Sequence, residues 1–274
     1  MERGNPARGP RSVVLLSDFG LTDPYVGQMR GTIARLAPEV QILDLTHGVT
    51  PFNLPQAGYF LAASAPHFPE DAVFVAVVDP GVGTDRRIVA AERRRQIFLA
   101  PDNGLLDLVL QGAEPLRVFD LTPDAITLGR ASATFQGRDV FAPLAARLAL
   151  GEPPSDLGTA MDPAGLVRSS WGSPVSENGG VEAQVLHVDR FGNCVLNLRQ
   201  DFVLPSGEAR LVTPQARPLR RVRTYADLAE GQVGLLLGSQ GFLELAQFMG
   251  SAADLLGLEP GASVRLAWGA ACST

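Results

Sequence analysis

Two aspartates each follow a continuous apolar run, at positions where an α/β protein would use them. Asp18 follows residues 13–16, and Asp79 follows residues 72–78. Such runs are typical of strands buried on both faces of a parallel sheet. Ligands of open α/β sheets bind outside the carboxyl ends of the strands, and a carboxylate can accept hydrogen bonds from both ribose hydroxyls. The pair therefore predicts a nucleoside-type pocket, although each aspartate taken singly is also typical of a cap or a turn.

The loop after Asp79 combines an acid with a guanidinium. Pro80, Gly81 and Gly83 break regular structure and let the backbone approach a ligand closely. Arg86 follows in the same loop, so that both charges could face one cavity. A surface turn with Arg86 in a surface ion pair is the alternative that this spacing leaves open.

Three well-known motifs do not fit. Residues 18–20 spell the Asp-Phe-Gly of protein kinases, but no glycine-rich loop, lysine strand or His-Arg-Asp precedes them. Residues 81–83 lack the third glycine of a dinucleotide-binding fingerprint. The chain also has no Gly-x-Ser-x-Gly elbow with partners for a catalytic triad.

Composition restricts the class of protein further. The 274 residues are 46% apolar and 19% charged, which favours a large folded domain, or a large and a small one, over disorder. A net charge of −6 gives no electrostatic reason to expect a nucleic-acid partner. Cys194 and Cys272 are too few for a disulfide framework, and the histidines lack zinc-site spacing. With no membrane-length apolar run and a polar start, we expect a cytoplasmic protein without a membrane partner.

In the first half, strand patterns alternate with helix patterns. Asp23 is expected to cap a helix that begins at Pro24, and Tyr25, Met29, Ile33 and Leu36 recur at helical spacing on the face expected to be buried. This alternation predicts an α/β domain, with a mostly parallel sheet sandwiched by helices. The expected strands are 13–16, 40–45, 72–78, 88–91, 96–100 and 116–121, and the expected helices are 24–36, 54–65, 105–110 and 140–150.

The second half has a different pattern. Short strand-like runs predict a small antiparallel β-barrel, and they cover 181–188, 194–198, 209–213, 233–237, 242–246 and 263–268. A stretch rich in proline and glycine precedes them and predicts a connection between domains. The predicted boundaries are 11–163 for the α/β domain, 164–180 for the linker and 181–274 for the barrel. Residues 189–193 join two of these strands and are typical of a hairpin loop.

Taken together, the motifs resemble the S-adenosylmethionine hydrolases (adenosine-forming), also called hydroxide adenosyltransferases, which are related to the fluorinase and chlorinase. The matching motifs are Ser17-Asp18-Phe19-Gly20, Asp44-Leu45-Thr46-His47, Thr50-Pro51-Phe52, Val78-Asp79-Pro80-Gly81-Val82-Gly83-Thr84, Ala100-Pro101-Asp102-Asn103-Gly104-Leu105-Leu106, Thr134-Phe135-Gln136-Gly137-Arg138-Asp139, Asp189-Arg190-Phe191-Gly192-Asn193 and Gly238-Ser239-Gln240-Gly241. The resemblance implies an N-terminal α/β domain and a C-terminal β-barrel. It also implies a homotrimer that binds substrate between the N-terminal domain of one subunit and the C-terminal domain of its neighbour.

The reaction that the resemblance implies is attack by water or hydroxide on the ribose C5′ of S-adenosyl-L-methionine. The products are adenosine and L-methionine, and no metal or organic cofactor takes part. In this reading Asp18 would hold the ribose hydroxyls and Phe52 would flank the ribose. Asp23 and Tyr25 would lie near the methionine part.

From the neighbouring subunit, the same resemblance implies that Asp189 and Ser239 bind the amino-acid end of the substrate. Phe191 and Asn193 would contact the nucleoside. These residues lie in the hairpin loop at 189–193 and in the glycine-flanked turn at 238–241.

One set of positions separates the branches of the family. Halogenases have tyrosine at the position of Asp79, whereas hydrolases have Asp, an Arg seven residues later, and a His. Here Asp79 and Arg86 are present, but Gln136 replaces the histidine. Asp79 would orient the water and take its proton, and Arg86 would favour hydroxide. Glutamine cannot take up a proton at neutral pH, so Gln136 would only position the water.

Three alternatives stay open. A halide-using enzyme is one, because Gly137 leaves room for an anion, although Asp79 would repel it. A protein that binds S-adenosylmethionine or adenosine and has lost catalysis is another, with Gln136 as the cause. A metal-dependent phosphoesterase that uses Asp18, Asp79, Asp102 and Asp139 is the third.

Overall fold

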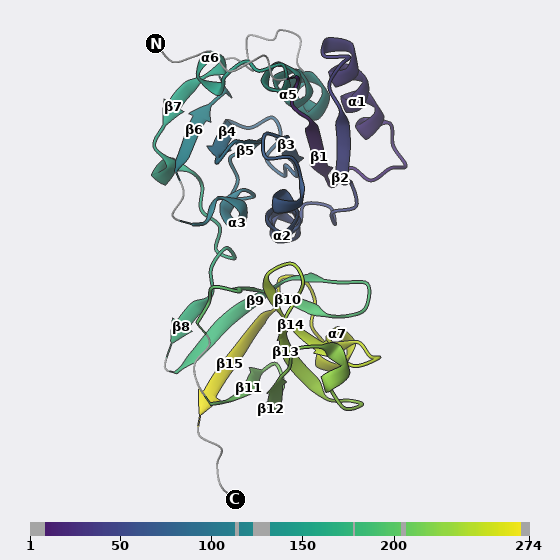
Figure 1. The fold of residues 1–274 in the computed structure, drawn as a ribbon, viewed down its shortest axis with the longest axis vertical. Coiled ribbons are helices and arrows are strands. Elements are labelled where there is room, and N and C mark those ends of the chain that lie inside the picture. The colour runs from purple at the N-terminus through teal and green to yellow at the C-terminus, as the bar shows by residue number, and fades with distance from the viewer. Residues whose placement is uncertain (1–8, 113–114, 123–131, 178, 204–206, 270–274) are drawn as a thin grey trace, which may run out of the picture. The chain divides into compact units, whose positions relative to one another are not determined.

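The computed structural model describes residues 9–112, 115–122, 132–177, 179–203 and 207–269 (Figure 1). Cys272 lies outside these residues, and Cys194 is a buried free thiol. The chain divides into two units, Met1–Ser169 and Ser170–Thr274. The first is α/β and the second is a β-barrel, so the predicted fold class is confirmed.

The first unit contains a seven-stranded sheet in the order β2-β1-β3-β5-β4-β6-β7. Strands β2, β1, β3 and β5 pair in parallel, and β4, β6 and β7 continue the sheet by antiparallel pairing. The bounds are β1 Val13–Ser17, β2 Ile42–Thr46, β3 Val73–Val77, β4 Ile88–Arg93, β5 Gln96–Pro101, β6 Leu116–Asp120 and β7 Thr159–Met161. Strand β7 was not predicted, because three residues carry no readable periodicity.

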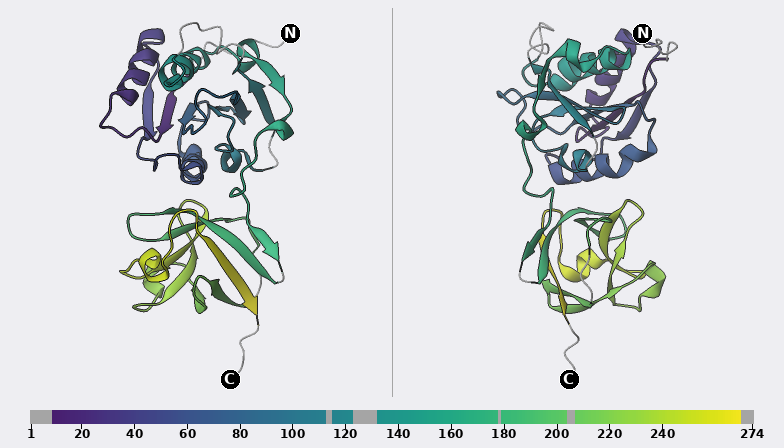
Figure 2. Two further views of the ribbon diagram at one scale, coloured as in Figure 1. Left: turned by 180° about the vertical axis from the view of Figure 1, so that it is seen from behind. Right: turned by 60° about the vertical axis from the view of Figure 1, so that its left-hand side comes forward.

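Helices cover both faces of this sheet (Figures 1 and 2). Helices α1 (Tyr25–Leu36) and α5 (Ala142–Ala149) pack together on one face, and α2 (Leu54–Ser64) and α3 (Asp107–Leu110) pack together on the other. Further helical turns in this unit are α6 Pro154–Leu157, η1 Ala65–His67 and η3 Pro163–Gly165. The predicted layers of helix, sheet and helix are therefore present.

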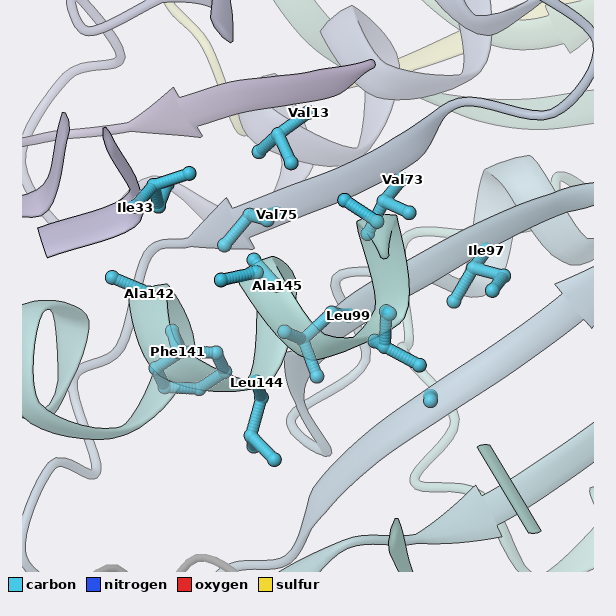
Figure 3. Packing of buried hydrophobic residues seen from close by; sticks show 14 of the residues in the cluster. Val13, Ile33, Val73, Val75, Ile97, Leu99, Phe141, Ala142, Leu144 and Ala145 are labelled. Carbon is cyan, nitrogen blue, oxygen red and sulfur yellow. The ribbon is translucent and has the colours of Figure 1, made fainter. Parts of the chain in front are cut away.

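The core between α5 and the sheet holds the central strands in place. Figure 3 shows Ala142 and Ala145 with Val13 of β1 and Val75 of β3, all of which are fully buried. The small alanine side chains let the helix lie close to the strands. Burial of each large apolar side chain contributes about 1.5–3 kcal/mol, so the ends of β1 and β3 are firmly supported.

Helix α1 differs from the prediction at its start and on its faces. Its N-cap is Pro24, which makes no side-chain capping hydrogen bond, so the prediction that Asp23 caps the helix is wrong. The buried face carries Val26, Met29 and Ile33. Met29 and Ile33 are buried as predicted, but Tyr25 and Leu36 are exposed, because they lie off the buried stripe through Val26, Met29 and Ile33. Tyr25 is thereby free to line a cavity.

The helix predicted from residue 140 begins with a π-helical turn, η2 (Gly137–Phe141), which precedes α5. The Ala142 N–H donates to the Gly137 carbonyl, five residues earlier. Pro143 has no N–H to donate to the carbonyl four residues before it, and its ring would clash with that carbonyl in an α-helix. The wider turn relieves this conflict, and such turns are frequent at functional sites.

The second unit is a closed barrel. The sheet order is β10-β14-β13-β12-β11-β15-β9-β8, and an additional pairing of β9 with β10 closes the ring. The bounds are β8 Val175–Glu177, β9 Gly180–Val188, β10 Cys194–Arg199, β11 Glu208–Thr213, β12 Arg217–Arg221, β13 Val233–Leu237, β14 Phe242–Gln247 and β15 Ser263–Gly269, with η4 Tyr225–Asp227 and α7 Ala252–Leu256. Pairing is antiparallel except between β12 and β13. Strands β8 and β12 and helix α7 were not predicted. Within the described ranges, no helix is long and apolar enough to cross a membrane.

Candidate active site

The site lies at a switch point of the parallel sheet, where the next strands in the chain are added on opposite sides of β1. Strand β1 pairs with β2 on one side and with β3 on the other. The loops that leave β1 and β3 therefore diverge and open a crevice at the carboxyl ends of these strands. Asp18 follows β1 and Asp79 follows β3, so both predicted aspartates flank this crevice.

A cavity of about 310 Å³ occupies the crevice, within the size range of small-molecule sites. Most of the site residues predicted in the first unit line it, namely Asp18, Tyr25, Phe52, Asp79, Gln136 and Gly137. Asp23 is exposed just before α1 and is not among the described lining residues.

Asp18 is held by the loop that precedes α2. Its Oδ2 accepts a hydrogen bond from the Phe52 backbone N–H at 2.8 Å. Phe52 has a φ of 66°, a left-handed conformation that costs a bulky residue free energy and is frequent at ligand sites. This bond leaves Oδ1 of Asp18 available for a ligand, and the exposed Phe52 ring lines the same cavity.

Arg86 joins Asp79 to Gln136. Its Nε donates to both Asp79 carboxylate oxygens, at 2.8 and 3.0 Å, and its Nη2 donates to Asp79 Oδ2 and to Gln136 Oε1. The Asp79 and Arg86 side chains are only 7% and 10% exposed. Asp79 and Gln136 line the cavity. Arg86, which binds both of them, is not among the described lining residues.

The orientation of the Gln136 amide follows from this contact. A guanidinium has donors only, so Gln136 must turn its oxygen towards Arg86. Its amide nitrogen, with two donor hydrogens, then remains for other partners. Gln136 is therefore a donor at the cavity rather than an acceptor.

The loop between Asp79 and Arg86 has the geometry that brings the two together. The Thr84 N–H and hydroxyl both donate to the Gly81 carbonyl, at 3.1 and 2.7 Å. Gly83 has a φ of +81°, and a Cβ there would lie 3.0 Å from the Ala133 carbonyl oxygen. Glycine is thus required at this position, and the predicted irregular loop is present.

Aromatic side chains form one wall of the cavity, and two of them, Phe19 and Phe135, were not predicted from the sequence. Ring centroids lie 5.8 Å apart for Phe19 and Tyr25, 5.9 Å for Phe19 and Phe135, and 4.9 Å for Tyr25 and Phe135. Phe19 and Phe135 each lie next to a predicted site residue within one of the family motifs, and this adjacency is the signal in the sequence that could have identified them. The other lining residues that were missed are Pro51, Val77, Val82 and Thr134.

Side chains pack against Gly137 on the side where a Cβ would lie. A Cβ at Gly137 would lie 3.1 Å from the Met29 sulfur and 3.2 Å from both the Phe19 and Phe135 rings. Close packing of these side chains explains the glycine. Gly137 also lines the cavity, so the expectation of room for an anion there stays a prediction.

The aspartates of the phosphoesterase alternative are engaged separately. Asp79 pairs with Arg86, Asp102 with Arg87, and Asp139 with Arg138. The hydrogen bond from Arg138 holds the pKa of Asp139 below its usual value. Over the described residues, no group of three or more His, Cys, Asp or Glu side chains could hold a metal ion.

The remaining predicted residues belong to the second unit. Asp189 closes the β9–β10 loop: its Oδ1 accepts from the N–H groups of Phe191 and Asn193, and its Oδ2 accepts from the Asn193 amide, each at 2.9 Å. The hairpin loop that the sequence predicted is thus present. Phe191 is 77% exposed, and Ser239 is exposed in the turn between β13 and β14.

A buried carboxyl in the barrel gives a pH-dependent prediction. The Tyr225 hydroxyl donates to Glu244 Oε2 at 2.9 Å. Burial raises the pKa of Glu244, so the carboxyl binds its proton more tightly in the native state than in the unfolded chain. The free energy of unfolding therefore falls as the pH rises from the unfolded-state pKa of this group through its native-state pKa. We expect Glu244→Gln to melt at a higher temperature than wild type at pH 7, with the difference vanishing below about pH 4. Thermal scans across pH test this, with the exposed Glu208→Gln as control; an unchanged melting temperature at pH 7 would contradict it.

The fold and the site together define a class of protein: a two-domain α/β and β-barrel protein with an acid-lined ligand pocket at a switch point of its parallel sheet. Family models identify the class more closely. Residues 13–158 match the N-terminal domain of SAM hydroxide adenosyltransferases, and residues 183–265 match their C-terminal domain. The chain belongs to the SAM hydroxide adenosyltransferase family.

Individual similar proteins point to the same family. An (R)-S-adenosyl-L-methionine hydrolase of Thermus thermophilus is 44% identical, over 93% of this chain and 99% of the relative. Another, of Salinispora arenicola, is 41% identical, over 92% and 96%. A fluorinase of Actinoplanes is 27% identical, over 88% and 92%. A crystal structure of an uncharacterized conserved protein from Thermotoga maritima superposes with a TM-score of 0.81 at 32% identity, over 93% and 99%.

Proposed function

We propose that this protein hydrolyses S-adenosyl-L-methionine to adenosine and L-methionine. The observation that carries the proposal is the Asp79–Arg86–Gln136 group, of which Asp79 and Gln136 line the same cavity as Asp18. The relatives named (R)-S-adenosyl-L-methionine hydrolase support the same substrate and reaction.

In the proposed reaction, a water oxygen forms a bond to the ribose C5′ as the bond from C5′ to sulfur breaks. The bonding electron pair stays on sulfur, so the cationic sulfonium becomes the neutral thioether of methionine. Because this leaving group needs no protonation, the enzyme has to place and partly dehydrate the nucleophile. The proton that water loses goes to a base in the pocket or to solvent.

The residues of the pocket divide this work. Among the lining residues that the structure describes, Asp18 and Asp79 are the carboxylates. With Asp18 assigned to the ribose, Asp79 accepts from the water and takes its proton. Gln136 donates to the water through its amide nitrogen. Arg86 acts through both residues: it fixes their orientation, and its charge favours an anionic nucleophile.

The test is to incubate the purified full chain with S-adenosyl-L-methionine and separate the products by chromatography. We expect adenosine and L-methionine in equal amounts, with no effect of a metal chelator, because the proposed reaction uses neither metal nor organic cofactor. Absence of adenosine at every pH from 6 to 10 would refute the proposal.

Exchange of Gln136 for the histidine of the family's hydrolase pattern tests whether this position supplies a base. Because Gln136 is placed as a donor and Asp79 as the base, we expect Gln136→His to change kcat less than about tenfold, or about 1.4 kcal/mol of barrier. The pH optimum should stay where it is. Gln136→Leu, which has no donor, should cost more than Gln136→His. A gain well above tenfold, with an optimum shifted towards neutrality, would show that a base is missing at this position.

A binding protein that has lost catalysis is the second candidate, favoured by Gln136 in place of histidine. Such a protein would bind S-adenosyl-L-methionine or adenosine tightly without turnover. Calorimetry on the protein used in the product assay distinguishes the two candidates, because binding heat without adenosine formation is expected only of the second.

The proposal includes a cytoplasmic homotrimer whose active sites use Asp189, Phe191, Asn193 and Ser239 of a neighbouring subunit. The family membership and the exposed Phe191 side chain support it. Light scattering of the purified chain measures the oligomer, and cell fractionation measures the location. Mixed oligomers of Asp79→Asn and Ser239→Ala chains should be more active than either parent if sites form between subunits.

A further inference from the structure

His47 follows β2 and contacts the segment that carries Asp18 from two sides. The His47 Nδ1 lies 2.7 Å from the Ser17 hydroxyl, and the His47 carbonyl accepts from the Gly20 N–H at 2.8 Å. The Ser17 hydroxyl also accepts from the Phe19 N–H at 3.3 Å. Residues 17–20 are therefore fastened to one residue at both ends, with Asp18 between the fastenings.

The hydrogen-bond pattern assigns the imidazole a tautomer. The Ser17 hydroxyl can donate as well as accept, whereas the Asp44 carboxylate beside Nε2 can only accept, so Nδ1 is assigned as the acceptor from Ser17. The ring hydrogen is placed on Nε2, which lies 3.3 Å from Asp44 Oδ1 but is too poorly aligned for a good hydrogen bond. Asp44 also pairs with Arg30. The short bond to Ser17 is thus the main contact of the ring.

Burial makes this contact costly to lose. Ser17 is 1% exposed and His47 is 4% exposed, and a buried polar group left without a partner destabilises its surroundings. His47 is not among the described lining residues of the cavity, so it reaches a ligand only through the segment that it holds. That segment carries Asp18, whose Oδ2 accepts from the Phe52 N–H and whose Oδ1 has no hydrogen-bond partner among the described residues.

We propose that His47 is a positioning residue for ribose recognition. Through Ser17 it sets the 17–20 segment so that Asp18 presents Oδ1 to the ribose hydroxyls. This inference rests on the proposed function, in which Asp18 binds the ribose. It differs from a purely structural role, because it predicts a loss that is specific to ligands with ribose hydroxyls.

The experiment compares adenosine with 2′,3′-dideoxyadenosine, which lacks both hydroxyls, by calorimetry on the full chain. Wild type should prefer adenosine. His47→Ala and Ser17→Ala should each weaken adenosine binding about tenfold or more, as for loss of a charged hydrogen bond, and change dideoxyadenosine binding less than about twofold. His47→Asn, whose amide oxygen can replace Nδ1 as acceptor, should recover most of the preference. His67→Ala, which removes an exposed imidazole in η1, is the control.

The outcomes are separable. Full retention of the preference for adenosine in both His47→Ala and Ser17→Ala would overturn the inference and leave the proposed function intact. Equal weakening of both nucleosides, with a lower melting temperature, would also overturn it, because that pattern marks a purely structural role. If His47→Ala does not fold, Ser17→Ala and His47→Asn decide. Equal binding of both nucleosides by wild type would overturn the ribose site itself, and this inference with it.

Discussion

Asp79→Asn is expected to lower kcat for hydrolysis of S-adenosyl-L-methionine by about 10²–10⁴-fold, the usual contribution of a positioned acid–base group. Asparagine keeps the size of the side chain but cannot take the proton that the attacking water loses. Adenosine binding should change much less, because Asp18 rather than Asp79 is assigned to the ribose. Steady-state kinetics and calorimetry with adenosine measure the two effects separately.

The matched control for this substitution is Asp85→Asn. Asp85 lies in the same loop but is exposed, so its replacement should leave kcat within about twofold of wild type, as for most surface changes. A loss smaller than about tenfold in Asp79→Asn would contradict the assignment of the base. Combined with a large gain in Gln136→His, it would place the missing base at position 136.

Arg86→Met is expected to reduce stability as well as activity. It leaves the buried Asp79 carboxylate without its guanidinium, and breaking a buried ion pair in this way costs about 3–5 kcal/mol of unfolding free energy. It also releases the Gln136 amide, so that two groups at the nucleophile lose their orientation. Urea unfolding measures the first effect. The second should appear as a fall in kcat of about 10²–10³-fold, comparable to loss of one charge-stabilising donor.

A double variant separates the two effects. Asp79→Asn with Arg86→Met no longer buries an unpaired charge, so it should recover much of the lost stability and none of the activity. Arg95→Met is the control, because Arg95 is 43% exposed and its contacts with Glu70 and Asp71 are long, at 3.8 and 3.5 Å. Its cost should stay within about 1 kcal/mol. A double variant no more stable than Arg86→Met would show that Arg86 supports the loop by packing rather than by charge.

The sequence by itself determined the elements and the residues that follow them. Continuous apolar runs located β1 and β3, and the aspartates after them were correctly expected near the carboxyl ends of parallel strands. Helix α2 and most barrel strands could also be located, because periodic burial is a local property of the chain. The short strand β7 and the parallel pairing of β12 with β13 could not, since only contacts with distant neighbours stabilise them.

Only the tertiary structure decided how the site residues meet. Arg86 and Gln136 are 50 positions apart, and their contact fixes the orientation of the amide. The aromatic wall joins Phe19, Tyr25 and Phe135 from three separate segments, and Phe19 and Phe135 pack where a Cβ of residue 137 would lie, so that this position requires glycine. The physical reason is common to these features. Local patterns report which side of an element is buried, whereas the direction of a polar side chain depends on partners that folding brings from elsewhere in the chain.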